Sequence, residues 1–165
     1  ERGDRGGFAV LHVDDLPAPV AHVATIGTAR RQRTVPANVA FHRIQTLPPF
    51  QDPRVEALDL DDEEADAYIA LQDLPFGNAP HHQACGYDNP VQVGGMQVDC
   101  DEMANGRTAP DPQDAARRWL LLLQIDEDEA LGFRWGDAGR LYFWVEPERA
   151  VRGDFSNCWR VLQCC

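Results

Sequence analysis

The sequence predicts an α+β domain in which largely antiparallel β-sheets carry one longer helix and short helices packed on them. Three observations support this class: apolar segments broken by Pro and Gly in the first half, one well-capped helical segment near the middle, and short apolar segments at the end. With 165 residues, the chain has the length of one domain that buries its own hydrophobic core.

The first half predicts two strands. Residues 8–14 (FAVLHVD) and 38–47 (NVAFHRIQTL) carry β-branched and aromatic side chains in loose alternation. The segments between them, which include LPAP and ARRQRTVPA, are typical of loops.

Residues 61–74 give the clearest helix signal in the chain. Asp61 is a favourable N-cap, and Glu64 three residues later completes a capping box. Gln72 stands where the next apolar residue of the stripe is due, so Leu71 is expected to complete the buried face. The other side chains expected on the packed side are those of Ala65, Tyr68 and Ile69.

The next segment, residues 75–110, has several glycines and little periodicity, which predicts a long ordered loop. Asp111 is expected to cap a short helix after it, because Pro112 suits the first helical position.

Three strands are predicted at the end of the chain, at residues 119–126, 140–145 and 158–164, with a brief helical turn at 147–154. Alternation places bulky side chains on both faces of the 140–145 strand, so both faces are expected to be covered. The residues predicted to form one buried cluster are Trp119, Leu121, Leu123, Leu141, Phe143, Trp144 and Leu162.

The tight turn before that strand, WGDAG at residues 135–139, suits either an active-site loop or a structural corner. The corner is favoured, because Gly136 and Gly139 supply permissive backbone angles while Trp135 packs. Asp137 is expected to accept hydrogen bonds from backbone amides of the turn.

The formal net charge of −12 disfavours nucleic acid and anionic membranes as partners, and it permits a basic protein or cations. No apolar run approaches the length of a membrane span, and residues 1–13 lack the layout of a signal peptide, so a cytoplasmic location is expected. Five cysteines in a chain of this length favour free thiols over disulfides.

Several segments together resemble the YwqG-like family of uncharacterised bacterial proteins: HHQACGYDNPVQ, LLLLQIDEDEALGFRWGDAGRLYFWV and DFSNCWRVLQC. The resemblance implies a single YwqG-like domain over residues 1–165 that lacks the N-terminal section of longer members. It implies no established reaction. Some members of the family resemble immunity proteins encoded beside bacterial toxins.

The loop after residue 125 collects the carboxylates of Asp126, Asp128, Glu129 and Asp137. Oxygen-rich loops can hold Ca²⁺ or Mg²⁺, but this one lacks the glycine and ligand spacing of an EF-hand. A solvated acidic loop is therefore favoured, in which residues 126–129 form an exposed negative patch that attracts a basic protein partner.

His81 and His82 lie close in sequence to Cys85, which suggests zinc or a Cys-His nucleophilic pair. A structural zinc site needs four ligands in paired short spacings, and only one such pair is present. Nothing marks an oxyanion hole or a nucleophile elbow, so neither a metal nor another cofactor is expected.

Two functions remain open. The favoured hypothesis is a non-catalytic protein-binding domain that acts as an immunity-type inhibitor of a toxin-like basic protein. The alternative is a small metal-dependent or Cys/His hydrolase that uses His81, His82, Cys85 and the acidic loop. The candidate binding residues are Asp126, Asp128, Glu129, Asp137, His81 and His82. An enzyme is expected to gather these groups in one concave pocket, whereas a binding protein leaves them dispersed.

Overall fold

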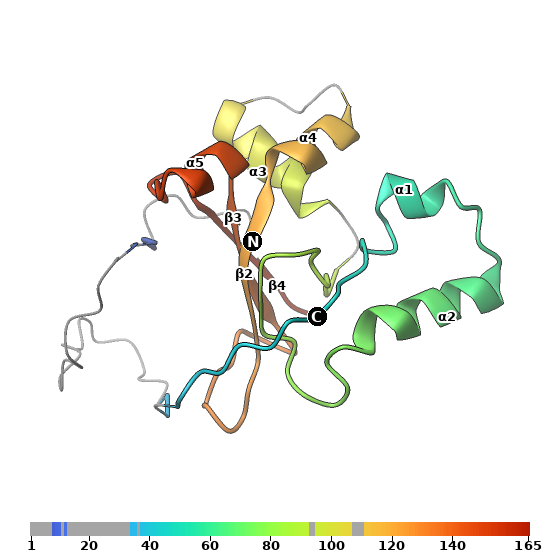
Figure 1. Cartoon of the computed structure of the whole chain (residues 1–165), viewed down its shortest axis with the longest axis horizontal. Coiled ribbons are helices and arrows are strands. Elements are labelled where there is room, and N and C mark those ends of the chain that lie inside the picture. The colour runs from blue at the N-terminus through green and yellow to red at the C-terminus, as the bar shows by residue number, and fades with distance from the viewer. Residues whose placement is uncertain (1–7, 11, 13–33, 36, 93–94, 107–110) are drawn as a thin grey trace.

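The structure is a computed structural model that describes residues 8–10, 12, 34–35, 37–92, 95–106 and 111–165. Its centre is a four-stranded antiparallel sheet in the order β1-β2-β3-β4 (Figure 1). The strands are β1 (Gln83–Ala84), β2 (Leu120–Asp126), β3 (Arg140–Val145) and β4 (Trp159–Gln163). The helices are α1 (Pro53–Glu56), α2 (Asp62–Asp73), α3 (Met96–Asn105), α4 (Pro112–Arg118) and α5 (Pro147–Val151). The predicted α+β class is confirmed.

The hydrophobic core lies between one face of the sheet and helices α3 and α4. The register pairs Leu121 with Trp144 and Trp144 with Trp159, so these three side chains lie on the same face. From α3, Met96 and Cys100 complete this cluster. Its buried members are Met96, Cys100, Trp119, Leu121, Tyr142, Trp144, Trp159 and Val161.

The predicted core cluster is therefore only partly correct. Trp119, Leu121 and Trp144 belong to the core as expected. Leu123, Phe143 and Leu162 are half-buried, because strand alternation places them on the other face of the sheet. There Phe143 meets Phe8, whose ring centroid is 6.0 Å away.

The α2 capping box is confirmed, since Asp61 and Glu64 exchange hydrogen bonds at 2.9 and 3.1 Å. The packed side of α2 agrees with the prediction in part: Ala65 and Tyr68 are half-buried, whereas Ile69 and Leu71 are both exposed. Gln72 takes the inner position, where its side-chain amide donates to the Pro48 carbonyl oxygen at 2.6 Å. The same carbonyl oxygen accepts a hydrogen bond from the Tyr68 hydroxyl at 2.9 Å, so two polar side chains attach α2 to one backbone acceptor.

Residues 75–110 are not one long loop, because α3 occupies Met96–Asn105. The helix is bounded by glycines, with Gly95 at its N-cap and Gly106 at its C-cap in the left-handed region (φ 68°). Its core-facing side chains are Met96, Cys100, Met103 and Ala104, which recur at helical spacing.

The predicted strand at residues 38–47 does not form. Residues 38–47 have no ladder partner and lie in neither helix nor strand. They are tied to the 81–92 region instead, where Thr46 Oγ1 accepts a hydrogen bond from the Tyr87 backbone N–H at 2.9 Å. Residues 8–10 and 12 also lie outside any strand, and the rest of that segment is outside the described residues. The short helix at Pro112, the turn at α5 and the three final strands agree with the prediction.

Candidate functional site

The sheet face that packs on α3 continues as a row of polar side chains, and these hold residues 81–92, called here the 81–92 loop. Gln124 on β2 is fully buried. Its Oε1 accepts a hydrogen bond from the Asn89 backbone N–H at 3.0 Å, and its Nε2 donates to the His81 carbonyl oxygen at 2.8 Å. One side chain thus fixes both ends of the loop to the sheet.

The next two strands add further contacts to the same loop. On β3, the Tyr142 hydroxyl donates to the Asn89 carbonyl oxygen at 2.9 Å and lies 3.2 Å from the Val91 backbone N–H. On β4, Gln163 Oε1 accepts from the backbone N–H groups of Val91 and Gln92 at 2.9 and 3.1 Å. Burial raises the pKa of the Tyr142 hydroxyl, so it remains a neutral donor. Strand side chains therefore satisfy the backbone of an irregular segment.

Arg140 on β3 links the loop to the first of the predicted acidic residues. Its guanidinium donates to Asn89 and forms an ion pair with Asp126, whose Oδ2 lies 2.9 Å from Nη2. Burial by itself raises the pKa of Asp126, but the hydrogen bonds from Arg140 and from the His81 backbone N–H outweigh it and lower the pKa. Asp126 is thus committed to an internal ion pair.

The two histidines are held by the same region. His81 stacks on Phe76, with ring centroids 4.3 Å apart, and burial together with the nearby Arg140 charge lowers its pKa. His82 Nδ1 accepts a hydrogen bond from the Asp126 backbone N–H at 3.1 Å. Its proton therefore lies on Nε2, which is 3.4 Å from Asp128 Oδ2. Both imidazoles serve the packing of the loop.

The predicted exposed patch at residues 126–129 is wrong for three of its four members. Asp126, Glu127 and Asp128 are half-buried, and only Glu129 is exposed. Asp128 Oδ1 accepts hydrogen bonds from the backbone N–H groups of Ala130 and Leu131, at 2.8 and 3.3 Å, and so closes the turn after β2. The carboxylates of Asp126 and Asp128 thus accept hydrogen bonds from backbone N–H groups, and that of Asp126 also from the Arg140 guanidinium.

The WGDAG turn is a structural corner, as predicted, but Glu127 organises it. Glu127 Oε1 accepts from the backbone N–H groups of Trp135 and Gly139, at 2.8 and 3.2 Å, while the predicted acceptor, Asp137, has an exposed side chain. A Cβ on Gly139 would stand 2.3 Å from the Trp135 carbonyl oxygen, so the turn requires glycine there for close approach. Gly136 has φ 122°, which suits glycine.

Hydrogen bonds thus join four of the predicted candidate residues, His81, His82, Asp126 and Asp128, whereas the side chains of Glu129 and Asp137 are exposed. Cys85 is exposed and has a positive φ of 60°. Within the described residues, no group of three His, Cys, Asp or Glu side chains is placed to hold a metal ion. No described helix is both long and apolar enough to cross a bilayer.

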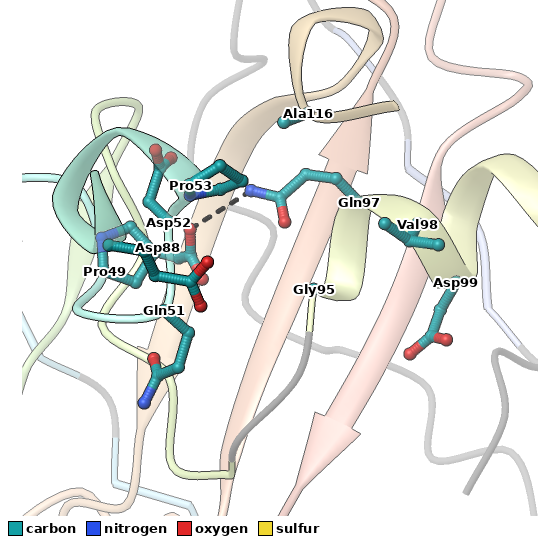
Figure 2. Close-up of a pocket in the computed structure, with 11 residues that line it drawn as sticks. Pro49, Gln51, Asp52, Pro53, Asp88, Gly95, Gln97, Val98, Asp99 and Ala116 are labelled. Atoms are coloured by element: carbon teal, nitrogen blue, oxygen red, sulfur yellow. Dashed lines mark hydrogen bonds between the residues drawn. The ribbon is translucent and has the colours of Figure 1, made fainter. Parts of the chain in front are cut away.

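A pocket of about 410 Å³ opens between α1 and α3, away from the predicted residues (Figure 2). Its lining combines aliphatic and acidic side chains: Pro49, Gln51, Asp52, Pro53, Glu56, Asp88, Gly95, Gln97, Val98, Asp99 and Ala116. None of its carboxylates was predicted as a site residue. These carboxylates come together only because α3 forms one wall of the pocket, and α3 was not predicted from the sequence.

Asp88 belongs to the 81–92 loop and is the buried acid of this pocket. Only 4% of its surface is exposed. Gln97 Nε2 on α3 lies 3.3 Å from its Oδ1, the hydrogen bond drawn in Figure 2. Burial raises the pKa of Asp88 to about 6. Asp52 differs, because the hydrogen bond from Arg54 lowers its pKa.

Helix α2 presents a second feature that can engage a partner. The α2 surface is defined here by exposed acidic and apolar side chains: Leu58, Asp59, Asp61, Asp62, Glu63, Glu64, Asp66, Ile69, Leu71 and Leu74. No residue of α2 is fully buried, and residues 55–80 contain no lysine or arginine. In Figure 1, α2 stands to the side of the sheet and the α3–α4 pair.

A family model described as a domain of unknown function (DUF1963) matches residues 1–164. No curated protein matches the chain.

Proposed function

The chain belongs to the DUF1963 family of domains of unknown function, and from that premise we propose that it is a non-catalytic protein-binding domain whose α2 surface docks a basic protein partner. The observation that carries the proposal is the composition of the α2 surface. It combines several exposed carboxylates with exposed apolar side chains, of which Leu74 is 71% and Leu58 59% exposed. Such a surface suits a partner that presents basic residues around apolar contacts.

The electrostatics of the surface favour attraction of a cationic partner. The acidic residues on the side of α2 opposite to Tyr68 include Glu63 and Asp66. The chain as a whole has a net charge of −12, so its long-range field has the same sign as this local surface. Complementary charge of this kind raises the association rate more than the final affinity.

The placement of the candidate catalytic residues supports binding over hydrolysis. His82, Asp126 and Asp128 take part in hydrogen bonds that stabilise the 81–92 loop and the turn after β2. Neither His81, His82 nor Cys85 lines the pocket between α1 and α3. A hydrolase would need such groups to converge on a site that also holds substrate.

An immunity-type inhibitor of a cationic toxin in the cytoplasm is the specific form of this function that we favour. The resemblance of residues 81–92 and of the last third of the chain to YwqG-like proteins is compatible with the DUF1963 family, and some YwqG-like proteins resemble immunity proteins. The acidic α2 surface supplies the chemistry for such a partner.

The test uses the purified protein encoded beside this gene and measures its association with the chain by surface plasmon resonance. Glu63→Arg with Asp66→Arg is expected to slow association several-fold at low ionic strength, and added salt should shrink the difference. Leu74→Ser is expected to accelerate dissociation.

The matched control is Glu129→Arg with Glu148→Arg, which makes the same charge change at exposed residues elsewhere. Equal slowing by the control would assign the effect to net charge alone and reject the α2 surface. Hydrolysis of the partner by the wild-type chain would reject a non-catalytic role.

A further inference from the structure

We propose that the pocket between α1 and α3 binds an aliphatic organic cation of the diamine type, with the Asp88 carboxylate as its anchor. The site is separate from the α2 surface, and the proposal does not rest on the protein-binding function. It follows from the burial of Asp88, from the signs of the charges around it and from the apolar walls.

The charge of the pocket lining is negative on both sides. Asp52 and Glu56 come from the α1 side, Asp99 from α3 and Asp88 from the 81–92 loop, and the described residues of the lining include no lysine, arginine or histidine. Arg54 compensates Asp52 through an ion pair at 2.6 Å. The amino end of α3 adds a partial positive charge of about one half, which the formal charges of Glu56 and Asp88 exceed.

Asp88 is the part of the site that most needs a cationic partner. It is more than nine-tenths buried, and a buried carboxylate is unfavourable unless it is paired. Among the described residues, its carboxyl group accepts a hydrogen bond from its own backbone N–H and one from Gln97 Nε2, the latter at the long distance of 3.3 Å. A carboxylate can accept about four hydrogen bonds. An ammonium group in the pocket would supply the missing charge and donors.

The rest of the lining selects an organic cation over a metal ion. No three ligating side chains of the described residues converge as a metal requires, so the carboxylates are spread around the pocket. Between them lie the aliphatic surfaces of Pro49, Pro53, Val98 and Ala116. The volume of about 410 Å³ lies in the range of small-molecule sites. A ligand with two separated positive charges joined by a methylene chain matches these spread carboxylates and the aliphatic surfaces between them.

The adjoining pocket helps to define the end of the site. It is lined by Arg54, Tyr87 and Arg117, and it shares Asp52, Pro53 and Ala116 with the first. Its two guanidinium groups repel a cation, so the ligand is confined to the Asp88 side.

Isothermal titration with 1,4-diaminobutane tests the proposal, and 1,4-butanediol serves as its neutral isostere. We expect saturable binding of the diamine and none of the diol. Asp88→Asn keeps the shape and removes the charge, and it is expected to weaken binding about tenfold or more. Glu148→Gln, an exposed acid on α5, is the matched control and should bind as the wild type does.

Two further measurements make the result decisive. Ala116→Leu narrows the pocket without changing its charge, so it should also weaken binding, while the thermal melting of each variant reports whether it is folded. Binding should strengthen from about pH 5 to pH 7.5, because Asp88, whose charged neighbours around the pocket are Asp52, Glu56, Asp99 and Arg54, loses its proton over that range.

The proposal is overturned if the wild type shows no saturable diamine binding. It is also overturned if Asp88→Asn and Ala116→Leu both bind normally, or if Mg²⁺ displaces the diamine at equal concentration, as expected of unspecific ion pairing. The α2 variants Glu63→Arg and Asp66→Arg should bind the diamine unchanged, so failure of this site and failure of the proposed function are distinguishable.

Discussion

The side chain of Gln124 is fully buried in the interior of the sheet, and its Oε1 accepts a hydrogen bond from the backbone N–H of Asn89 at 3.0 Å. Gln124→Ala would leave this N–H and the His81 carbonyl oxygen without a partner. Since each buried unsatisfied group costs about 1–3 kcal/mol, we expect the free energy of unfolding to fall by about 2–4 kcal/mol. Urea denaturation measures it.

Gln45→Ala is the control for that variant. Gln45 is exposed, and its substitution should change the free energy of unfolding by less than about 0.5 kcal/mol. Equal effects of the two substitutions would show that Gln124 does not hold the loop.

Glu127 and Asp137 give a second, paired prediction. Glu127→Ala removes the acceptor of the Trp135 and Gly139 N–H groups and should destabilise the fold by about 1–3 kcal/mol. Asp137→Ala should have an effect within about 0.5 kcal/mol, because its side chain is exposed. Chemical denaturation of both variants decides the matter, and a larger loss for Asp137→Ala would refute the assignment of the turn to Glu127.

Core truncation should distinguish the two faces of β3. Trp144→Ala creates a cavity in the main core and is expected to cost about 3–5 kcal/mol. Phe143→Ala should cost less, about 1–2 kcal/mol, because Phe143 is half-buried and its described aromatic neighbour is Phe8. Thermal or urea unfolding gives both values. A reversed order would place the main core on the other face of the sheet.

Asp88 predicts a specific pH dependence of stability. Its pKa rises from 3.8 to about 6 on folding, so the folded state holds the proton more tightly than the unfolded chain. The resulting stabilisation is complete below pH 3.8 and is lost as the pH rises through about 6, in total about 3 kcal/mol. Asp88→Asn has no carboxyl group to titrate at this position. The free energy of unfolding of the variant, relative to that of the wild type, should therefore rise by about 3 kcal/mol between about pH 3.5 and pH 7.

The comparison of the wild type with Asp88→Asn separates the contribution of Asp88 from that of carboxylates whose pKa values are lowered on folding. Asp52 and Asp126 have lowered pKa values, so they stabilise the fold as the pH rises in both proteins. The charge of Asp52 also raises the pKa of Asp88, and this interaction is absent from the variant. Parallel stability curves for the two proteins would mean that Asp88 is solvated in the folded state.

Local sequence signals correctly predicted those elements whose side chains suit both their secondary structure and their surroundings in the fold. The Asp61 and Glu64 capping box forms as expected, because it requires only neighbouring residues. The β2 and β3 segments also form strands, since their apolar side chains fill the core or the second face. Residues 38–47 have strand-like composition but pair with no strand, and pairing depends on a distant partner that composition does not reveal.

The missed elements had weaker or ambiguous signals. The apolar residues of α3 recur at helical spacing from Met96 to Ala104, but the glycines at both ends suggested a loop. For the candidate site, the informative residues were the glutamines inside apolar strands, Gln124 and Gln163, since a buried amide needs partners in space. Which segment supplies those partners depends on the tertiary fold, as does the burial of Asp88.

The dependence of the 81–92 loop on three strands also determines when its backbone amides can meet solvent. The hydrogen bonds of Asn89, Val91 and Gln92 have acceptors on β2, β3 and β4, so the loop has its native form only when all three strands are paired. Irregular segments normally open locally and exchange their amide hydrogens fast. Here the loop should exchange as slowly as the sheet, within a single cooperative unit of hydrogen exchange.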